Sequence, residues 1–89
     1  MNIVEITYDF NSRAVSLGLP MIGEDDWDDS DDRLAKLPYS PVEGGAVHTV
    51  EYRDGAGWRL LGPTGRTLED SDSVDDILAR LAEIMEDMA

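Results

Sequence analysis

The 89-residue chain contains twenty acidic and seven basic side chains, which gives a formal net charge of −13 at pH 7. A charge of this sign and size repels nucleic acid and anionic membranes and attracts basic protein surfaces. The chain has no cysteine, which excludes a disulfide framework, a thiolate metal site and a cysteine nucleophile. Apolar residues make up 42% of the chain, enough for one small core, so we expect a single domain over residues 1–89.

The first residues lack the basic region and apolar run of a secretory signal. No segment approaches the roughly 18 consecutive apolar residues of a transmembrane helix. We therefore expect a cytoplasmic protein that does not contact membranes.

The N-terminal segment alternates between apolar and polar residues. In residues 3–10 the apolar positions two apart predict a strand, and residues 13–19 alternate again. Asn11 and Ser12 fit a two-residue turn, so these two strands are predicted to form a hairpin that ends at Pro20. The alternating apolar positions are Val4, Ile6, Tyr8, Phe10, Val15, Leu17 and Leu19.

The next segment is strongly acidic, with carboxylates at seven of the nine positions 24–32. Like charges at this density repel one another, so the segment must face water, cations or a cationic partner. We expect it to be a loop. Residues 31–37 are predicted to form a short helix, with Ser30 as its N-cap and Pro38 as its stop.

The second half of the chain predicts a hairpin followed by a helix. Residues 46–53 and 58–61 read as strands around a glycine-rich loop, and 66–68 as a short further strand. From Val74, apolar residues recur at helical spacing behind the N-cap Ser73. The predicted fold class is therefore α+β: an antiparallel sheet of two β-hairpins, with the C-terminal amphipathic helix packed on one face and an acidic loop or short helix between the hairpins.

Metal binding and catalysis find little support in the residue pattern. Asp26, Asp28, Ser30 and Asp32 alternate as in a calcium loop, but Asp31 and Leu37 replace the required glycine and glutamate. The one histidine, His48, shares strand parity with apolar residues and is expected to be packed. We expect no metal, no cofactor and no enzymatic activity.

Trp27 lies inside the most charged segment, and two interpretations are open. Its indole either packs into the core and anchors the acidic segment, which is the commoner outcome, or stays exposed as a binding hot spot ringed by charge. The bases Arg53, Arg59 and Arg66 fall together in the second half of the chain. Arg53 and Arg59 are expected to pair with Glu51 or Glu69 across strands.

In size, acidity, lack of cysteine and clustering of acids at 24–32 and 69–76, the chain resembles the small acidic inhibitors that phages use against host nucleases and defence systems. Anti-CRISPR proteins and the uracil-DNA glycosylase inhibitor are of this type. The resemblance implies a nucleic-acid mimic whose carboxylates occupy the place of phosphates on a basic nucleic-acid-binding host protein or complex, such as a CRISPR–Cas effector. It implies no direct contact with nucleic acid, and we expect a monomer or a homodimer.

The residues predicted to bind this partner are Glu24, Asp25, Asp26, Trp27, Asp28, Asp29, Asp31, Asp32, Asp70, Asp72, Asp75, Asp76 and Glu83. One alternative is a small acidic adaptor or immunity-type protein whose basic partner does not handle nucleic acid. Another is an acidic housekeeping domain with no dedicated partner. Concentration of the acids on one face favours a binding function, and an even spread favours the housekeeping domain.

Overall fold

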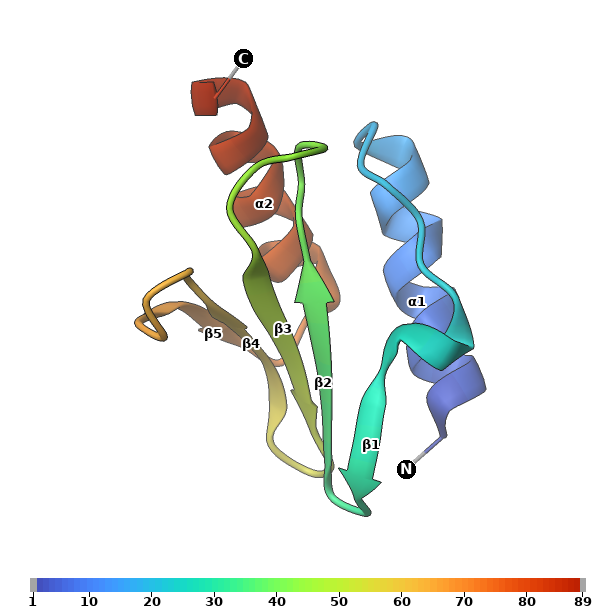
Figure 1. The fold of residues 1–89 in the computed structure, drawn as a ribbon. Helices are drawn as coiled ribbons and strands as arrows, with labels where there is room; N and C mark the ends of the chain where they lie inside the picture. Colours follow the sequence, from blue (N-terminus) through green and yellow to red (C-terminus); the bar gives the residue numbers. More distant parts are fainter. Residues whose placement is uncertain (1, 89) are drawn as a thin grey trace.

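The computed structural model describes residues 2–88, and Figure 1 shows the arrangement of their helices and strands. Within these residues the elements are α1 (Ile3–Ser16), the short 3-10 helix η1 (Glu24–Asp26), β1 (Asp28–Asp31), β2 (Leu34–Tyr39), β3 (His48–Arg53), β4 (Gly57–Leu61), β5 (Thr67–Ser71) and α2 (Val74–Met88). The predicted α+β class is confirmed, and the architecture is a helix, an antiparallel sheet and a second helix.

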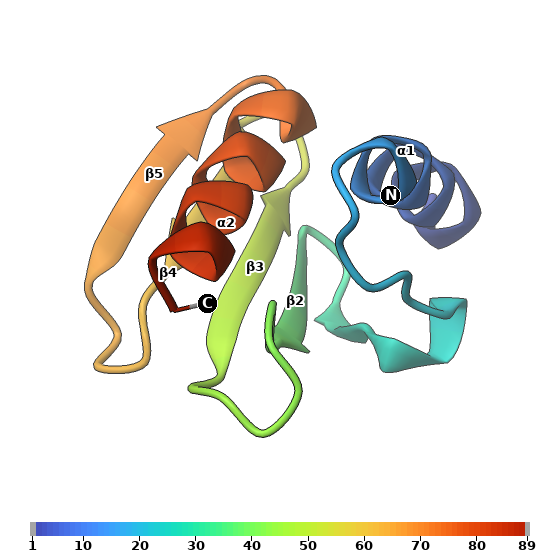
Figure 2. The ribbon, with the colours of Figure 1, turned by 90° about the horizontal axis from the view of Figure 1, so that it is seen from above.

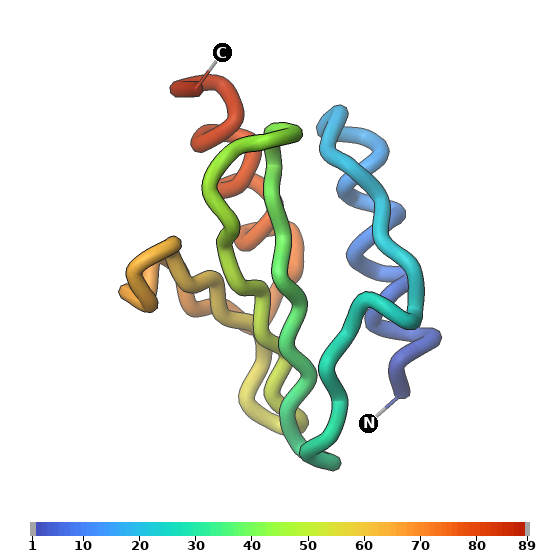
Figure 3. The backbone as a smooth tube through the Cα atoms, viewed as in Figure 1, coloured from blue at the N-terminus to red at the C-terminus, as the bar shows by residue number. Residues whose placement is uncertain are grey.

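The strands form one meander in the order β1-β2-β3-β4-β5, and each neighbouring pair is antiparallel. The tube in Figure 3 shows the chain passing from strand to strand, through short turns except for the longer loop of residues 40–47 between β2 and β3. Consequently β1 and β5 are the two edges of the sheet, and the chain segments that precede β1 and follow β5 lie at opposite edges.

Both helices pack on the same face of the sheet, as the view from above shows (Figure 2). Alternate residues of β2, β3 and β4 point toward these helices and are buried, whereas their neighbours in sequence face the other side. Ile6 and Phe10 of α1 and Ile77 and Leu81 of α2 close the core from the helical side. The sheet side away from α1 and α2 is called the open face below.

The predicted strand over residues 3–10 and the hairpin with 13–19 are wrong, because this segment forms α1. The Asn2 side chain accepts a hydrogen bond from the backbone N–H of Glu5 at 3.2 Å and caps the helix. Ile6, Phe10 and Ala14 recur four residues apart and are buried together. Ile6 and Phe10 fit both the two-residue period of a strand and the period of a helix, and the burial of Ala14 with them favours the helix.

The predicted Asn11–Ser12 turn is also wrong, since both residues lie inside α1. The Asn11 side-chain amide donates to the carbonyl of Ile22 and accepts from its N–H, both at 2.8 Å. This pair of bonds holds the segment after α1 against the helix. It brings the chain to the position where the acidic run begins.

The predicted short helix over 31–37 is wrong, because Asp31 ends β1 and Leu34–Tyr39 form β2. The Asp31 carboxylate accepts from the N–H of Arg33 at 2.9 Å, which stabilises the turn between the two strands. Alternating burial of Ala35, Leu37 and Tyr39 then sets the strand period. Pro38 is tolerated because β1 pairs with β2 only as far as Lys36, so no ladder bond to β1 is lost there.

The second half of the chain follows the prediction closely. β3 and β4 form the expected hairpin, and α2 starts at Val74, where the Ser73 hydroxyl accepts from the N–H of Asp75 at 3.2 Å. The short further strand exists as β5, although it extends to Ser71.

Candidate functional site

The acidic run of residues 24–32 lies along one edge of the sheet, as η1, β1 and the start of the turn to β2. All seven of its carboxylates are exposed, and every residue of β1 is exposed. The segment predicted to be a loop or short helix is therefore an edge strand with a 3-10 helix in front of it. Successive side chains of an extended strand point to opposite sides, so β1 spreads its carboxylates along the edge rather than gathering them in a cluster.

Trp27, between η1 and β1, is buried with 6% of its surface exposed. Its indole N–H donates to the hydroxyl of Thr7 on α1 at 2.9 Å. Its ring meets Phe10 edge-on at 6.4 Å and Trp58 at 6.2 Å between centroids. The anchoring interpretation of Trp27 is thus the correct one, and the exposed hot-spot interpretation is wrong, because the indole already occupies the core.

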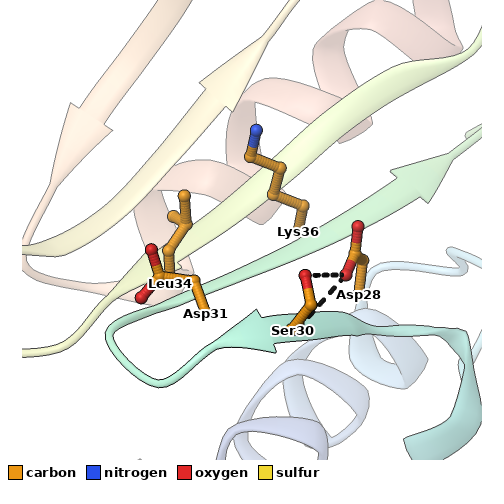
Figure 4. A pocket seen from close by; sticks show the side chains of 5 residues that line it. All are labelled: Asp28, Ser30, Asp31, Leu34 and Lys36. Atoms are coloured by element: carbon orange, nitrogen blue, oxygen red, sulfur yellow. Dashed lines mark hydrogen bonds between the residues drawn. The ribbon is translucent and has the colours of Figure 1, made fainter.

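Beside this edge, Asp28, Ser30 and Asp31 of β1 and Leu34 and Lys36 of β2 line a hollow of about 170 Å³ (Figure 4). Asp28 accepts from the hydroxyl of Ser30 at 3.0 Å and from its backbone N–H at 3.3 Å. These two hydrogen bonds, the hydroxyl first, hold the pKa of Asp28 below its ordinary value. Asp28 therefore keeps its charge at a lower pH than an isolated aspartate does.

The second predicted cluster lies at the other edge of the sheet, near β5 and the start of α2, and much of it is partnered within the protein. Asp70 pairs with Arg53 at 2.7 Å, and Asp76 accepts from the Ser71 hydroxyl at 2.6 Å. The remaining two ion pairs of this region are Arg13–Asp75 at 3.4 Å and Arg80–Glu83 at 3.1 Å. The structure thus does not bring the two predicted acidic clusters together.

On the open face, one charged residue from each strand stands in a single cross-strand row. Asp28 pairs in register with Lys36, Lys36 with Glu51, Glu51 with Arg59, and Arg59 with Asp70. The signs alternate along this row, which we call the charge row. Glu51 is only 3% exposed and accepts from Nε of Arg59 at 2.7 Å, which confirms the expected Arg59–Glu51 pair. Arg53 pairs with Asp70 rather than with Glu51 or Glu69.

A groove of about 540 Å³ lies between α1, the β3–β4 hairpin and the β5–α2 connection. Carboxylates from all three elements line it, and none of its lining residues is basic among the residues that the structure describes. Tyr52 and Trp58 supply aromatic walls, and their rings meet edge-on at 4.9 Å. The acids of this acidic groove are Glu5, Asp9, Asp54 and Asp72.

Gly57 shapes one end of the acidic groove. A Cβ at this position would lie 2.8 Å from the Ser71 carbonyl oxygen and 3.0 Å from Cα of Asp72, and its φ is +84°. Glycine therefore lets the β5–α2 connection approach β4 closely. Of the groove's acids, sequence reasoning selected only Asp72. Glu5 and Asp9 are polar positions of the strand predicted over residues 3–10, and only the helical spacing of Ile6, Phe10 and Ala14 could have placed them on α1.

Among residues 2–88, no group of three or more His, Asp or Glu side chains is placed to hold a metal ion. His48 is buried, and its Nδ1 lies 3.3 Å from the carbonyl oxygen of Ala46. This matches the packed histidine expected from the sequence. None of the helices in the described part of the chain is long and apolar enough to cross a membrane.

Comparison of the chain with protein-family models, with curated proteins and with solved structures finds no match in any of the three. The functional interpretation therefore rests on the fold, the two acidic edges and the acidic groove.

Proposed function

We propose that this protein is an acidic inhibitor that binds the basic nucleic-acid-binding surface of a host effector, such as a CRISPR–Cas complex, and acts there as a nucleic-acid mimic. In this role its carboxylates meet lysine and arginine side chains that otherwise contact phosphates. The protein blocks the site by occupying it and performs no chemistry on its partner.

The main support is the row of carboxylates on the edge strand β1, where Asp28, Asp29 and Asp31 are all exposed. Successive residues of a strand are about 3.3 Å apart. Successive phosphates of one DNA strand advance by about 3.4 Å along the helix axis. The edge therefore carries three charges within about 13 Å, a linear density somewhat below that of one DNA strand, although successive side chains of a strand point to opposite sides. Trp27 fixes this segment to the core.

A different kind of partner is the alternative. Ion pairing neutralises much of the acidic cluster near β5, and the acidic groove contains aromatic walls that a phosphate mimic does not require. These features favour a small adaptor or immunity-type protein that binds a basic protein unrelated to nucleic acid. The two functions differ in whether nucleic acid competes for the partner's surface.

The deciding experiment is a pull-down from bacterial lysate at low salt, with duplex DNA as competitor. We expect a nucleic-acid-binding protein to be retained and to be displaced by DNA. A retained partner that ignores DNA supports the adaptor. Retention no greater than that of a scrambled acidic peptide rules out both functions.

Two variants that remove three charges each test the site. The variant Glu24→Gln/Asp25→Asn/Asp29→Asn should weaken retention strongly, since these exposed carboxylates belong to the acidic run. The control Glu43→Gln/Glu86→Gln/Asp87→Asn removes the same charge from exposed positions elsewhere and should have a small effect. Equal losses in both variants would mean that net charge alone, and not the edge, attracts the partner.

A further inference from the structure

Helix α1 has a second apolar stripe on its solvent side. Val4, Tyr8 and Val15 are 63%, 72% and 59% exposed. At about 100° per residue, the three side chains fall within an arc of about 40° and extend over about 16 Å. The opposite side of the same helix buries Ile6 and Phe10. The helix is thus apolar on two sides, although the core uses only one.

The exposed stripe is unusual for so charged a protein. Single exposed apolar residues need no explanation, but three aligned ones that include an aromatic residue are typical of a contact surface. Tyrosine is enriched at binding hot spots, where its ring adds affinity that salt does not screen. Nothing in the acidic run supplies such a residue, because Trp27 is buried.

Negative charge flanks the stripe. Glu5 and Asp9 follow Val4 and Tyr8 directly on α1 and line the acidic groove together with Asp54 and Asp72. A partner that covers the stripe therefore places its neighbouring side chains over the acidic groove. Cationic side chains suit this position, since they find carboxylates there and the aromatic walls of Tyr52 and Trp58.

The charges also decide between occupants. A second copy carries the same net charge of −13, so self-association over this acidic surface is electrostatically unfavourable. An anionic lipid surface is repelled for the same reason. A basic protein segment with apolar side chains complements both the stripe and the acidic groove.

We propose that the outward face of α1 and the acidic groove form one docking surface for a basic, apolar-anchored segment of a partner protein. Apolar side chains of that segment pack on Val4 and Tyr8, and an arginine or lysine enters the acidic groove. This inference rests on the proposed function in requiring a basic protein partner, and it adds α1 and the acidic groove to the acidic run as contact surfaces.

The experiment uses the full ¹⁵N-labelled chain and three synthetic peptides as probes in an NMR titration. One peptide is an amphipathic Leu/Arg helix, the second replaces arginine with glutamine, and the third is oligo-arginine. We expect the Leu/Arg peptide to bind most tightly and to shift amide signals in residues 4–16, 52–58 and 72. Lack of binding by this peptide, or shifts centred on residues 24–32, overturns the proposal.

Matched variants test the two parts of the surface. Tyr8→Ala removes an exposed ring, and Glu5→Gln/Asp9→Asn removes two carboxylates. Each should weaken binding of the Leu/Arg peptide at least about tenfold. The controls Val47→Ser and Glu86→Gln/Asp87→Asn change exposed residues outside this surface and should leave the affinity within about twofold. Equal affinity of Tyr8→Ala and the unaltered chain contradicts the proposal.

The failure of this inference can be distinguished from that of the proposed function. If a DNA-displaceable partner is retained equally by Tyr8→Ala and Glu5→Gln/Asp9→Asn but lost on neutralising the acidic run, the inference is wrong and the inhibitor function stands. If the Leu/Arg peptide binds α1 but no nucleic-acid-binding protein is retained, the inference stands and the inhibitor function is wrong. If light scattering shows a dimer that Tyr8→Ala dissociates, α1 is a self-interface and the inference is wrong.

Discussion

The indole N–H of Trp27 donates to the hydroxyl of Thr7 across 2.9 Å, and this buried bond ties the acidic run to α1. Thr7 is itself buried, so both polar groups depend on each other for a partner. The bond lets the most charged segment of the chain stand at a fixed position on the sheet edge while its carboxylates stay in water.

Removing either partner of this bond should lower the free energy of unfolding. Trp27→Phe leaves the Thr7 hydroxyl without its donor, and Thr7→Val leaves the indole N–H without its acceptor, at a cost of about 1–3 kcal/mol each. Urea denaturation measures both. The double variant should lose less than the sum, because the second substitution removes a group that is already unsatisfied. Strict additivity would contradict this coupling.

Arg59→Met should be more damaging than the loss of an ordinary surface ion pair. It leaves Glu51, which is 3% exposed, without its cationic partner. We expect a loss of about 2 kcal/mol, below the range for fully buried pairs because a third of the Arg59 side chain is exposed. The double variant Glu51→Val/Arg59→Val should be more stable than Arg59→Met in the same denaturation assay. If Arg59→Met were instead the more stable of the two variants, the unpaired Glu51 carboxylate would be readily solvated.

Asp28 should titrate below the 3.8 of an isolated aspartate, because the Ser30 hydroxyl and N–H bond its charged form. A lowered pKa stabilises the fold above the ordinary value, and this contribution is lost as the pH falls through the pKa of the folded state. Carboxyl ¹³C NMR should show the pKa of Asp28 rising toward 3.8 in Ser30→Ala. An unchanged pKa in that variant would assign the shift to other groups.

Tyr39 should make the fold sensitive to alkali. Burial raises the pKa of its phenol, which donates to the Pro20 carbonyl at 2.7 Å. The neutral form is the stabilising one, so its contribution is complete below the ordinary pKa of 10.0 and is lost as the pH rises above it. The free energy of unfolding should therefore fall more steeply above pH 10 in the unaltered chain than in Tyr39→Phe. Identical slopes would exclude Tyr39 as the cause.

Gly57→Ala should destabilise the protein and disturb the acidic groove. The added Cβ would lie 2.8 Å from the Ser71 carbonyl oxygen, at a φ that only glycine adopts readily. We expect a loss of about 1–3 kcal/mol and shifted amide signals at Asp72. Gly55→Ala is the control, because its φ is also positive but no heavy atom lies within 4 Å of the added Cβ. Equal losses of stability in Gly57→Ala and Gly55→Ala would mean that the positive φ alone, and not the close contact with the Ser71 carbonyl, causes the destabilisation.

The second half of the fold could be predicted from sequence because its signals are local. The glycine-rich loop before Gly57, the Ser73 cap and the spacing of Ile77 and Leu81 each act within a few residues. In the first half the local signals are ambiguous. β-branched and aromatic residues in 3–10 favour a strand, and the bonds from Asn11 to Ile22 that hold the chain against α1 join distant segments.

The candidate site likewise has one part that could be predicted from the sequence and one part that could not. The acidic run was recognisable from its composition, and its exposure is confirmed by the structure. The acidic groove was not, because it gathers Glu5, Asp9, Asp54 and Asp72 from parts of the chain that the meander brings together. Sequence reasoning that placed residues 3–10 in a strand could not align Val4 with Tyr8 and Val15 on one helix face.

The charge row on the open face has a consequence for how the protein approaches a partner. Its alternating signs leave only one net negative charge among five residues, so this side of the sheet is almost electrically neutral. Most of the molecule's charge of −13 then lies toward the helices and the sheet edges. Such an uneven distribution is a molecular dipole. In the electric field of a basic surface, the protein should rotate before contact so that its negatively charged side faces the partner and the open face points away from it.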